Sequence, residues 1–188
     1  MGVFKTKWII LKINKPKDKD FLYTLFTYDF GKITVVKKKN SKEKLLDLWY
    51  VVGCEVRTKE WFDIHKVSNI KIWSEFNYEN RNFAIIESYL ELLSLVFKRT
   101  PNWNPIYEIF YILENINLYE DISLVKLTLG KLKILNCLWE LDIENKDLTV
   151  MKILKFINTH SIKDVLRLSW IDENIELKLS KIVKSIQK

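Results

Sequence analysis

The sequence predicts an α+β protein, with a small five-stranded barrel in residues 1–76 and an all-α domain in residues 77–188. Three observations favour this division. Alternation of apolar and polar residues is clearest before residue 77, whereas the later part follows a helical period of three and four residues. Three of the four glycines also precede residue 77. The charge divides there too, since residues 1–76 hold 16 Lys and Arg against 9 Asp and Glu, and the remainder holds 15 of each.

Five strand-like segments follow one another in the first part, rich in β-branched and aromatic residues and separated by turn-forming or charged stretches. The expected strands are Trp8–Ile13, Phe21–Tyr28, Lys32–Lys38, Leu45–Arg57 and Phe62–Trp73. Asp29-Phe30-Gly31 predicts a hairpin in which Gly31 adopts a positive φ. Gly53 predicts a bulge or sharp bend in the long fourth run. Five strands with one bent strand indicate a small closed barrel.

The second part has the pattern of successive helices. Pro101 ends the first helix and Pro105 opens the second, while Gly130 is expected at a close contact between helices. Ser161 and Asp164 have the spacing of a capping box for a short helix. The expected helices run from Phe83 to Phe97, from Pro105 through Leu113, from Ser123 to Trp139, from Leu148 to Ile157 and from Ile175 to Ile186.

The composition is that of a globular protein, with 48% hydrophobic and 29% charged residues. No secretory signal is visible, and the apolar run Trp8–Leu11 is far too short to span a membrane. We therefore expect a cytoplasmic protein without a membrane partner. The two cysteines, Cys54 and Cys137, are far apart in the sequence, which excludes a disulfide framework and a CxxC metal pair.

No motif of a catalytic site occurs in the chain. The glycine-rich nucleotide-binding motifs and the GxSxG nucleophile motif are absent from the sequence. The only histidines, His65 and His160, lack Cys, Asp or Glu at metal-ligand spacing, so we expect surface or helix-cap roles for them. Glu87 and Glu91 share a helix face and are expected to form a solvated edge. The sequence thus predicts no enzyme, no metal site and no cofactor.

The basic excess is concentrated around the predicted hairpin and the strand before it. Concentrated positive charge is typical of proteins that bind a polyanion, nucleic acid first and anionic membrane second. Lysines neutralise phosphates, and exposed rings stack on unpaired bases. A solvated strand that happens to carry lysines would show the same pattern. The candidate DNA-binding residues are Lys5, Lys7, Lys12, Tyr28, Phe30, Lys32, Lys37, Lys38, Lys39, Lys42 and Lys44.

The stretch TLFTYDFGKITVV, residues 24–36, resembles the "TLFT…GK…V" hairpin of the bacterial DNA repair protein RecO family. Trp8–Lys12 looks like the first strand of that family, and Asp63–Val67 looks like its last barrel strand. Tyr89–Leu93 with the following Pro101-Asn102 is similar to its first long helix and the next loop. The resemblance therefore covers most of the chain in order.

This resemblance implies an N-terminal OB-fold, binding of single- and double-stranded DNA, strand annealing, and recombinase loading with RecR and single-stranded DNA-binding protein. Lys32 and Lys38 match basic positions of the family hairpin, whereas Thr34 and Lys39 depart from its pattern. Many members carry a four-cysteine zinc module where this chain has only Cys137, so no zinc is implied. A nonenzymatic recombination mediator in DNA repair is thus the main hypothesis. An OB-fold RNA-binding protein and a helical adaptor with an incidental basic barrel stay open.

Overall fold

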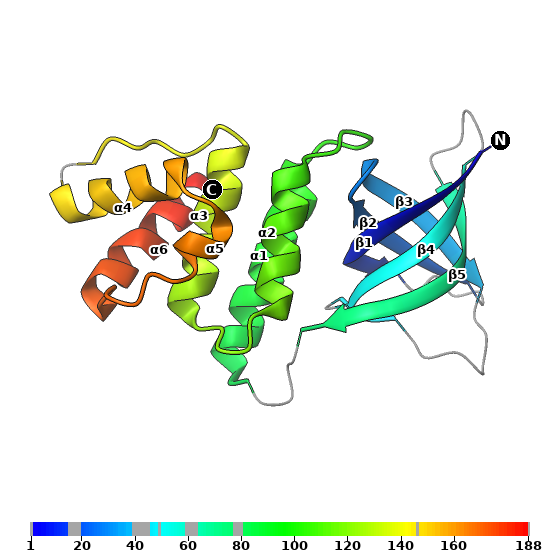
Figure 1. Ribbon diagram of the computed structural model, residues 1–188, viewed down its shortest axis with the longest axis horizontal. Coiled ribbons are helices and arrows are strands. Elements are labelled where there is room, and N and C mark those ends of the chain that lie inside the picture. Colours follow the sequence, from blue (N-terminus) through cyan, green and yellow to red (C-terminus); the bar gives the residue numbers. More distant parts are fainter. Residues whose placement is uncertain are drawn as a thin grey trace.

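The computed structural model describes residues 2–14, 20–38, 46–48, 50–58, 64–76, 81–145 and 147–187. In these ranges, five strands precede six helices, which confirms the α+β class and the order of its parts (Figure 1). The strands are β1 (Gly2–Asn14), β2 (Asp20–Thr27), β3 (Gly31–Lys38), β4 (Tyr50–Thr58) and β5 (Ile64–Glu75). The helices are α1 (Phe83–Arg99), α2 (Tyr107–Leu118), α3 (Leu124–Cys137), α4 (Leu148–Thr159), α5 (Ile162–Val165) and α6 (Glu173–Gln187).

The five strands form one mixed sheet that closes on itself, in the order β1-β2-β3-β5-β4. β1 pairs antiparallel with both β2 and β4, and β3 pairs with β5 in parallel. The pairing of β4 with β5 shifts register between Gly53 and Glu55, which confirms the predicted bulge. Gly31 has a φ of 68°, as the hairpin requires.

Two layers of apolar side chains hold the closed sheet in place. Its interior is filled by residues that alternate along the strands, with Trp8, Tyr23 and Leu25 among the fully buried side chains. On the outer face, Ile9 and Phe26 belong to the same core cluster as the helices. The sheet and the helical part therefore share one core, and α1 and α2 separate the sheet from the remaining helices (Figure 1). The domain boundary after residue 76 stays a prediction.

The loop between α1 and α2 closes over one end of the sheet. The backbone N–H of Trp103 donates to the carbonyl oxygen of Lys32 at 3.1 Å. Trp103 of this loop packs against the rings of Phe30 and His65, and Phe30 packs against Phe4; these four side chains are called here the aromatic cap. His65 is buried there with its ring 4.7 Å from that of Trp103, so the expected surface position is wrong. The reason is a contact across 38 residues, which strand periodicity does not reveal.

The helix boundaries follow local chemistry. The Ser161 hydroxyl accepts from the Asp164 backbone N–H at 3.3 Å and donates to its carboxylate at 2.6 Å, which confirms the predicted capping box. A Cβ at Gly130 would lie 2.6 Å from Ile116 Cδ1, which confirms the close helix contact.

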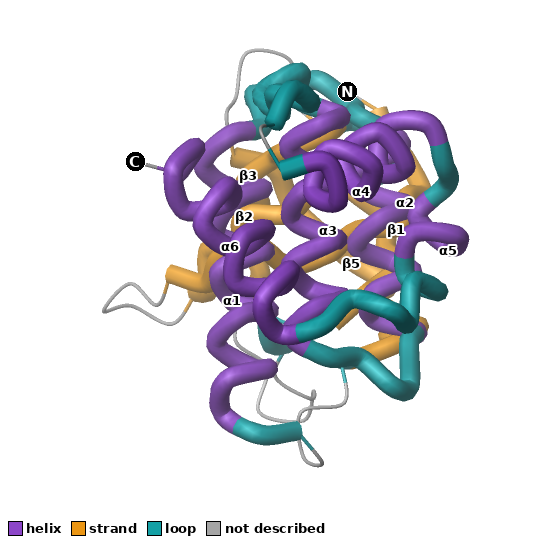
Figure 2. Tube along the Cα trace, turned by 90° about the vertical axis from the view of Figure 1, so that its left-hand side faces the viewer, coloured by secondary structure: helices purple, strands orange, loops and turns teal. Residues whose placement is uncertain are grey.

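β4 begins at Tyr50 instead of Leu45, since residues 46–48 are not in a strand. α5 lies beside α2 on the side away from α6 (Figure 2).

Candidate nucleic-acid interface

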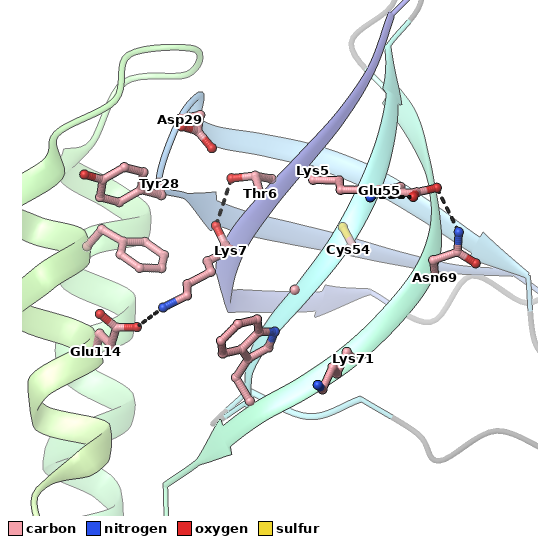
Figure 3. Close-up of a pocket in the computed structure, with 13 residues that line it drawn as sticks. Lys5, Thr6, Lys7, Tyr28, Asp29, Cys54, Glu55, Asn69, Lys71 and Glu114 are labelled. Atoms are coloured by element: carbon pink, nitrogen blue, oxygen red, sulfur yellow. Dashed lines mark hydrogen bonds and ion pairs between the residues drawn. The ribbon is translucent and has the colours of Figure 1, made fainter.

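A cleft of about 690 Å³ opens between the outer face of the sheet and α2 (Figure 3). β1, β4 and β5 form its floor, while α2 and the β2–β3 turn form the opposite wall. The lining residues are Lys5, Thr6, Lys7, Tyr28, Asp29, Gly53, Cys54, Glu55, Asn69, Lys71, Trp73, Phe110 and Glu114. Concave surfaces with apolar walls and a few polar groups are the usual form of a ligand site.

The strand register places a row of basic side chains on the floor of this cleft and beyond it. Val3 lies opposite Arg57, Lys5 opposite Glu55, and Lys7 opposite Gly53. On the other edge of β4, Gly53 lies opposite Lys71 and Arg57 opposite Lys66. Residues that are opposite, or two apart along a strand, share a face of the sheet. Five of the cations on this face lie on β1, β4 and β5 around the cleft and are named the basic face: Lys5, Lys7, Arg57, Lys66 and Lys71.

Trp73 of β5 presents a large aromatic surface to the cleft. Its side chain is 58% exposed, although a tryptophan is mostly buried in proteins. A Cβ built on Gly53 would lie 2.4 Å from Trp73 Nε1, so the indole rests against the β4 backbone where a side chain is missing. Gly53 therefore serves both the bulge and the placement of this ring.

Two lysines of the basic face flank the indole. Lys7 Nζ lies 4.7 Å from the ring centroid, and Lys71 Nζ lies 5.7 Å from it. Both distances are within the range of a cation–π interaction. An exposed ring between two ammonium groups can stack on a base while the cations contact the adjoining phosphates.

Two lysines of the cleft form ion pairs with carboxylates. Glu114 on α2 accepts from Lys7 Nζ at 3.0 Å, as Figure 3 shows. Glu55 lies 3.9 Å from Lys5 and accepts from Asn69 Nδ2 at 2.8 Å. The cleft is therefore close to neutral as it stands. A phosphate entering it would have to exchange with Glu114 for Lys7.

Of the two rings expected to stack on bases, Tyr28 lies at the cleft. It is 45% exposed, and its ring centroid is 4.9 Å from that of Tyr107 and 5.6 Å from that of Phe110. Tyr28 thus connects the sheet to α2 and keeps one exposed side. Phe30 does not line the cleft, because its ring packs against Phe4 at 5.1 Å in the aromatic cap.

Lys32 and Lys12 lie apart from the cleft, against α1. The Lys32 ammonium group donates to the carbonyl oxygen of Phe97 at 2.7 Å, and burial lowers the pKa of this lysine. That carbonyl has no helical donor four residues later, because position 101 is a proline. Lys12 Nζ lies 5.1 Å from the Phe97 ring. Lys32 therefore caps the C-terminal turn of α1 and is half-buried there, and its role as a DNA-binding residue stays a prediction.

The remaining predicted lysines lie elsewhere or outside the described residues. Lys37 and Lys38, at the end of β3, line a second hollow of about 890 Å³ together with Lys66 and Asp20. Lys39, Lys42 and Lys44 are outside the described residues. The structure therefore gathers Lys5, Lys7 and Tyr28 at one cleft and distributes the other described candidates over different surfaces.

Sequence reasoning missed Trp73 and Lys71. Both lie in the predicted strand Phe62–Trp73, where Ile70 and Ile72 alternate with them and pack toward the sheet interior. This alternation puts Lys71 and Trp73 together on the opposite, wet face. A tryptophan on the polar face of an amphipathic strand was the available signal.

Both cysteines are free thiols, with Cys54 buried and Cys137 half-buried. Trp8 Nε1 donates to Cys54 Sγ at 2.6 Å in the sheet interior, and burial raises the Cys54 pKa to about 12. Burial likewise raises the Cys137 pKa to about 11. Among the described residues, no group of three His, Cys, Asp or Glu side chains could hold a metal ion. None of the helices described is both long and apolar enough to cross a membrane.

No family model matches this chain, and none of the curated protein sequences does.

Proposed function

We propose that this protein binds single-stranded nucleic acid, with DNA as its ligand, and that it catalyses no reaction of its own. The observation that carries the proposal is the exposed Trp73 ring between Lys7 and Lys71, in the cleft at the edge of the basic face. Base stacking combined with phosphate neutralisation is sufficient for binding with little sequence preference.

We further propose that the closed sheet is an OB-fold. The closure of five strands into one sheet supports this, because OB-folds are five-stranded barrels that bind oligonucleotides. Their usual binding face lies on the second and third strands. In this chain α1 and α2 cover part of that face, since Phe26 is fully buried and Lys32 contacts Phe97. We therefore assign binding to the face formed by β1, β4 and β5.

The biological role that we propose is recombination mediation in DNA repair. It rests on the resemblance of residues 24–36 to the RecO hairpin and on the basic N-terminal part. Strand annealing and recombinase loading, with RecR and single-stranded DNA-binding protein as partners, belong to this proposal. Annealing is compatible with a nonenzymatic protein, because bringing two polyanions together mainly requires neutralisation of their charge.

The direct test is fluorescence anisotropy with a labelled single-stranded DNA oligomer. We expect Trp73→Ala to weaken binding by about 1–3 kcal/mol, the usual contribution of one stacked base. Trp139→Ala is the matched control, because Trp139 is 96% exposed at the end of α3 and does not line the cleft. Equal affinity of wild type and Trp73→Ala would refute the proposed site.

A matched RNA oligomer separates DNA from RNA as the ligand, because only the 2′-hydroxyl groups differ along the backbone. Tighter binding of the RNA would favour the alternative of an OB-fold RNA-binding protein. Failure of wild type to bind either oligomer would leave the helical adaptor as the better reading of the chain.

A further inference from the structure

The exposed rings of the cleft continue along α2 toward α5. Tyr28, at the cleft, contacts Tyr107 at the start of α2 with a centroid distance of 4.9 Å. Tyr111 follows four residues later, so it lies on the same side of the helix about 6 Å further along the axis. Tyr107 is 52% exposed and Tyr111 is 41% exposed. The three tyrosines therefore form a continuous open row that leaves the cleft.

Basic side chains accompany the far end of this row. Lys163 on α5 has its Nζ 5.7 Å from the Tyr111 ring centroid, which repeats the pairing of lysine and ring seen at Trp73. Arg167 follows one turn after Lys163 and is exposed. The nearby Asp164 is already bound by the Ser161 hydroxyl and interacts with Arg167. Glu108 and Glu114 flank the row on α2, so ring contacts and not net charge would dominate binding there.

We infer that a single strand held in the cleft continues over Tyr107 and Tyr111 to Lys163, so that α2 and α5 provide a second subsite for the same strand. This inference rests on the proposed function and adds the length of the bound segment and the residues that hold its distal end. Two features favour a nucleic acid over a protein at this surface. The row is continuous with the cleft, and it repeats the combination of an exposed ring with a cation that suits bases and phosphates.

A two-length binding experiment tests the inference. Wild type, Tyr111→Ala and Lys163→Glu are titrated with labelled oligothymidylates of ~5 and ~15 nucleotides, within the site sizes that single OB-folds cover. We expect wild type to bind the longer oligomer more tightly. Both substitutions should weaken binding of the longer oligomer by about 5-fold or more, the lower bound for one lost base stack, and change binding of the shorter one by less than about 2-fold.

Lys126→Glu is the matched control. Lys126 also lies over a tyrosine, with its Nζ 4.3 Å from the Tyr119 ring, but it is at the start of α3, away from the row. It changes the net charge of the protein by the same amount as Lys163→Glu. Equal weakening by the two charge reversals would show a general charge effect and overturn the inference. A melting curve is recorded for each variant to check that it is folded.

The remaining outcomes separate this inference from the proposed function. If both oligomers bind wild type equally, the second subsite is wrong. It is also wrong if Tyr111→Ala changes neither affinity while Trp73→Ala weakens both, and in that case the proposed binding site in the cleft is retained. If Tyr111→Ala weakens both oligomers equally, the tyrosine belongs to the cleft itself, and the second subsite is again wrong. If no oligomer binds wild type, the proposed function fails first. Loss of a protein partner with Tyr111→Ala, without loss of the longer oligomer, would assign this surface to a protein.

Discussion

The β2–β3 hairpin and strand β5 carry similar residues but have opposite surroundings. In the hairpin, Phe26 is fully buried against the helices and Lys32 donates to the last turn of α1. In β5, Lys71 and Trp73 lie on an open face beside the cleft. Lysines and rings alone therefore do not identify a binding surface. What decides is which face of the sheet the helices cover.

The largest expected effect belongs to the hairpin, as a change in stability. Gly31 has a φ of 68°, and a Cβ there would lie 2.2 Å from the backbone oxygen of Asn104. Backbone strain in the left-handed region and a clash with main chain add together, so Gly31→Ala should lower the free energy of unfolding by about 3–5 kcal/mol. Chemical denaturation measures this. A loss below about 1 kcal/mol would mean that the loop is not held against the hairpin.

The fold could be predicted from the sequence because its signals are local. Alternation of residues gives the strands, Gly31 and Gly53 give the turn and the bulge, and Ser161 gives a helix cap. The site could be predicted only in part. Parity along a strand separates the inner face of the sheet from the outer face, but it does not tell which part of the outer face the helices bury.

Two residues of β1 illustrate this limit. Ile9 and Lys7 are on the same outer face by parity, yet Ile9 is buried in the core shared with the helices and Lys7 lines the cleft. Apolar residues on the outer face, such as Ile9 and Phe26, were the sequence signal that helices cover this part of the sheet. The burial of His65 under Trp103 likewise depends on a loop that is distant in sequence.

The second prediction concerns Gly53 of β4 and tests whether the position of the Trp73 ring matters for binding. Gly53→Ala should displace the Trp73 indole, because its new Cβ would lie 2.4 Å from Nε1 in the present position. Binding of a short single-stranded oligomer should weaken by about 1–2 kcal/mol, within the value of one stacked base. The unfolding free energy should change by less, since the indole is largely exposed and can move. A variant that binds normally would show that the position of the ring does not matter.

The third prediction contrasts a lysine expected to bind phosphate, Lys71, with a lysine expected to stabilise the fold, Lys32. Lys71→Ala should reduce the magnitude of the log–log salt slope of binding by about 0.7, the contribution of one phosphate contact with a single strand. Its stability should stay within about 0.5 kcal/mol, because the side chain lies on the surface. Lys32→Ala should do the reverse, lowering stability by about 1 kcal/mol through loss of the bond to Phe97 while the salt slope stays unchanged. A lower slope for Lys32→Ala would show that the hairpin face binds DNA after all.

The smallest expected effect comes from the carboxylate that competes for Lys7. Glu114 Oε1 lies 3.0 Å from Lys7 Nζ, and both side chains are partly exposed, so the pair contributes little to stability. A phosphate reaching Lys7 must displace this carboxylate. Glu114→Gln should therefore raise affinity for single-stranded DNA by about 2-fold, equivalent to about 0.5 kcal/mol, at low salt, and the gain should disappear as salt screens the charges. Glu140→Gln is the control for net charge, because Glu140 pairs with Arg99 and does not line the cleft. Weaker binding by Glu114→Gln would instead mean that Glu114 holds Lys7 in position for the ligand.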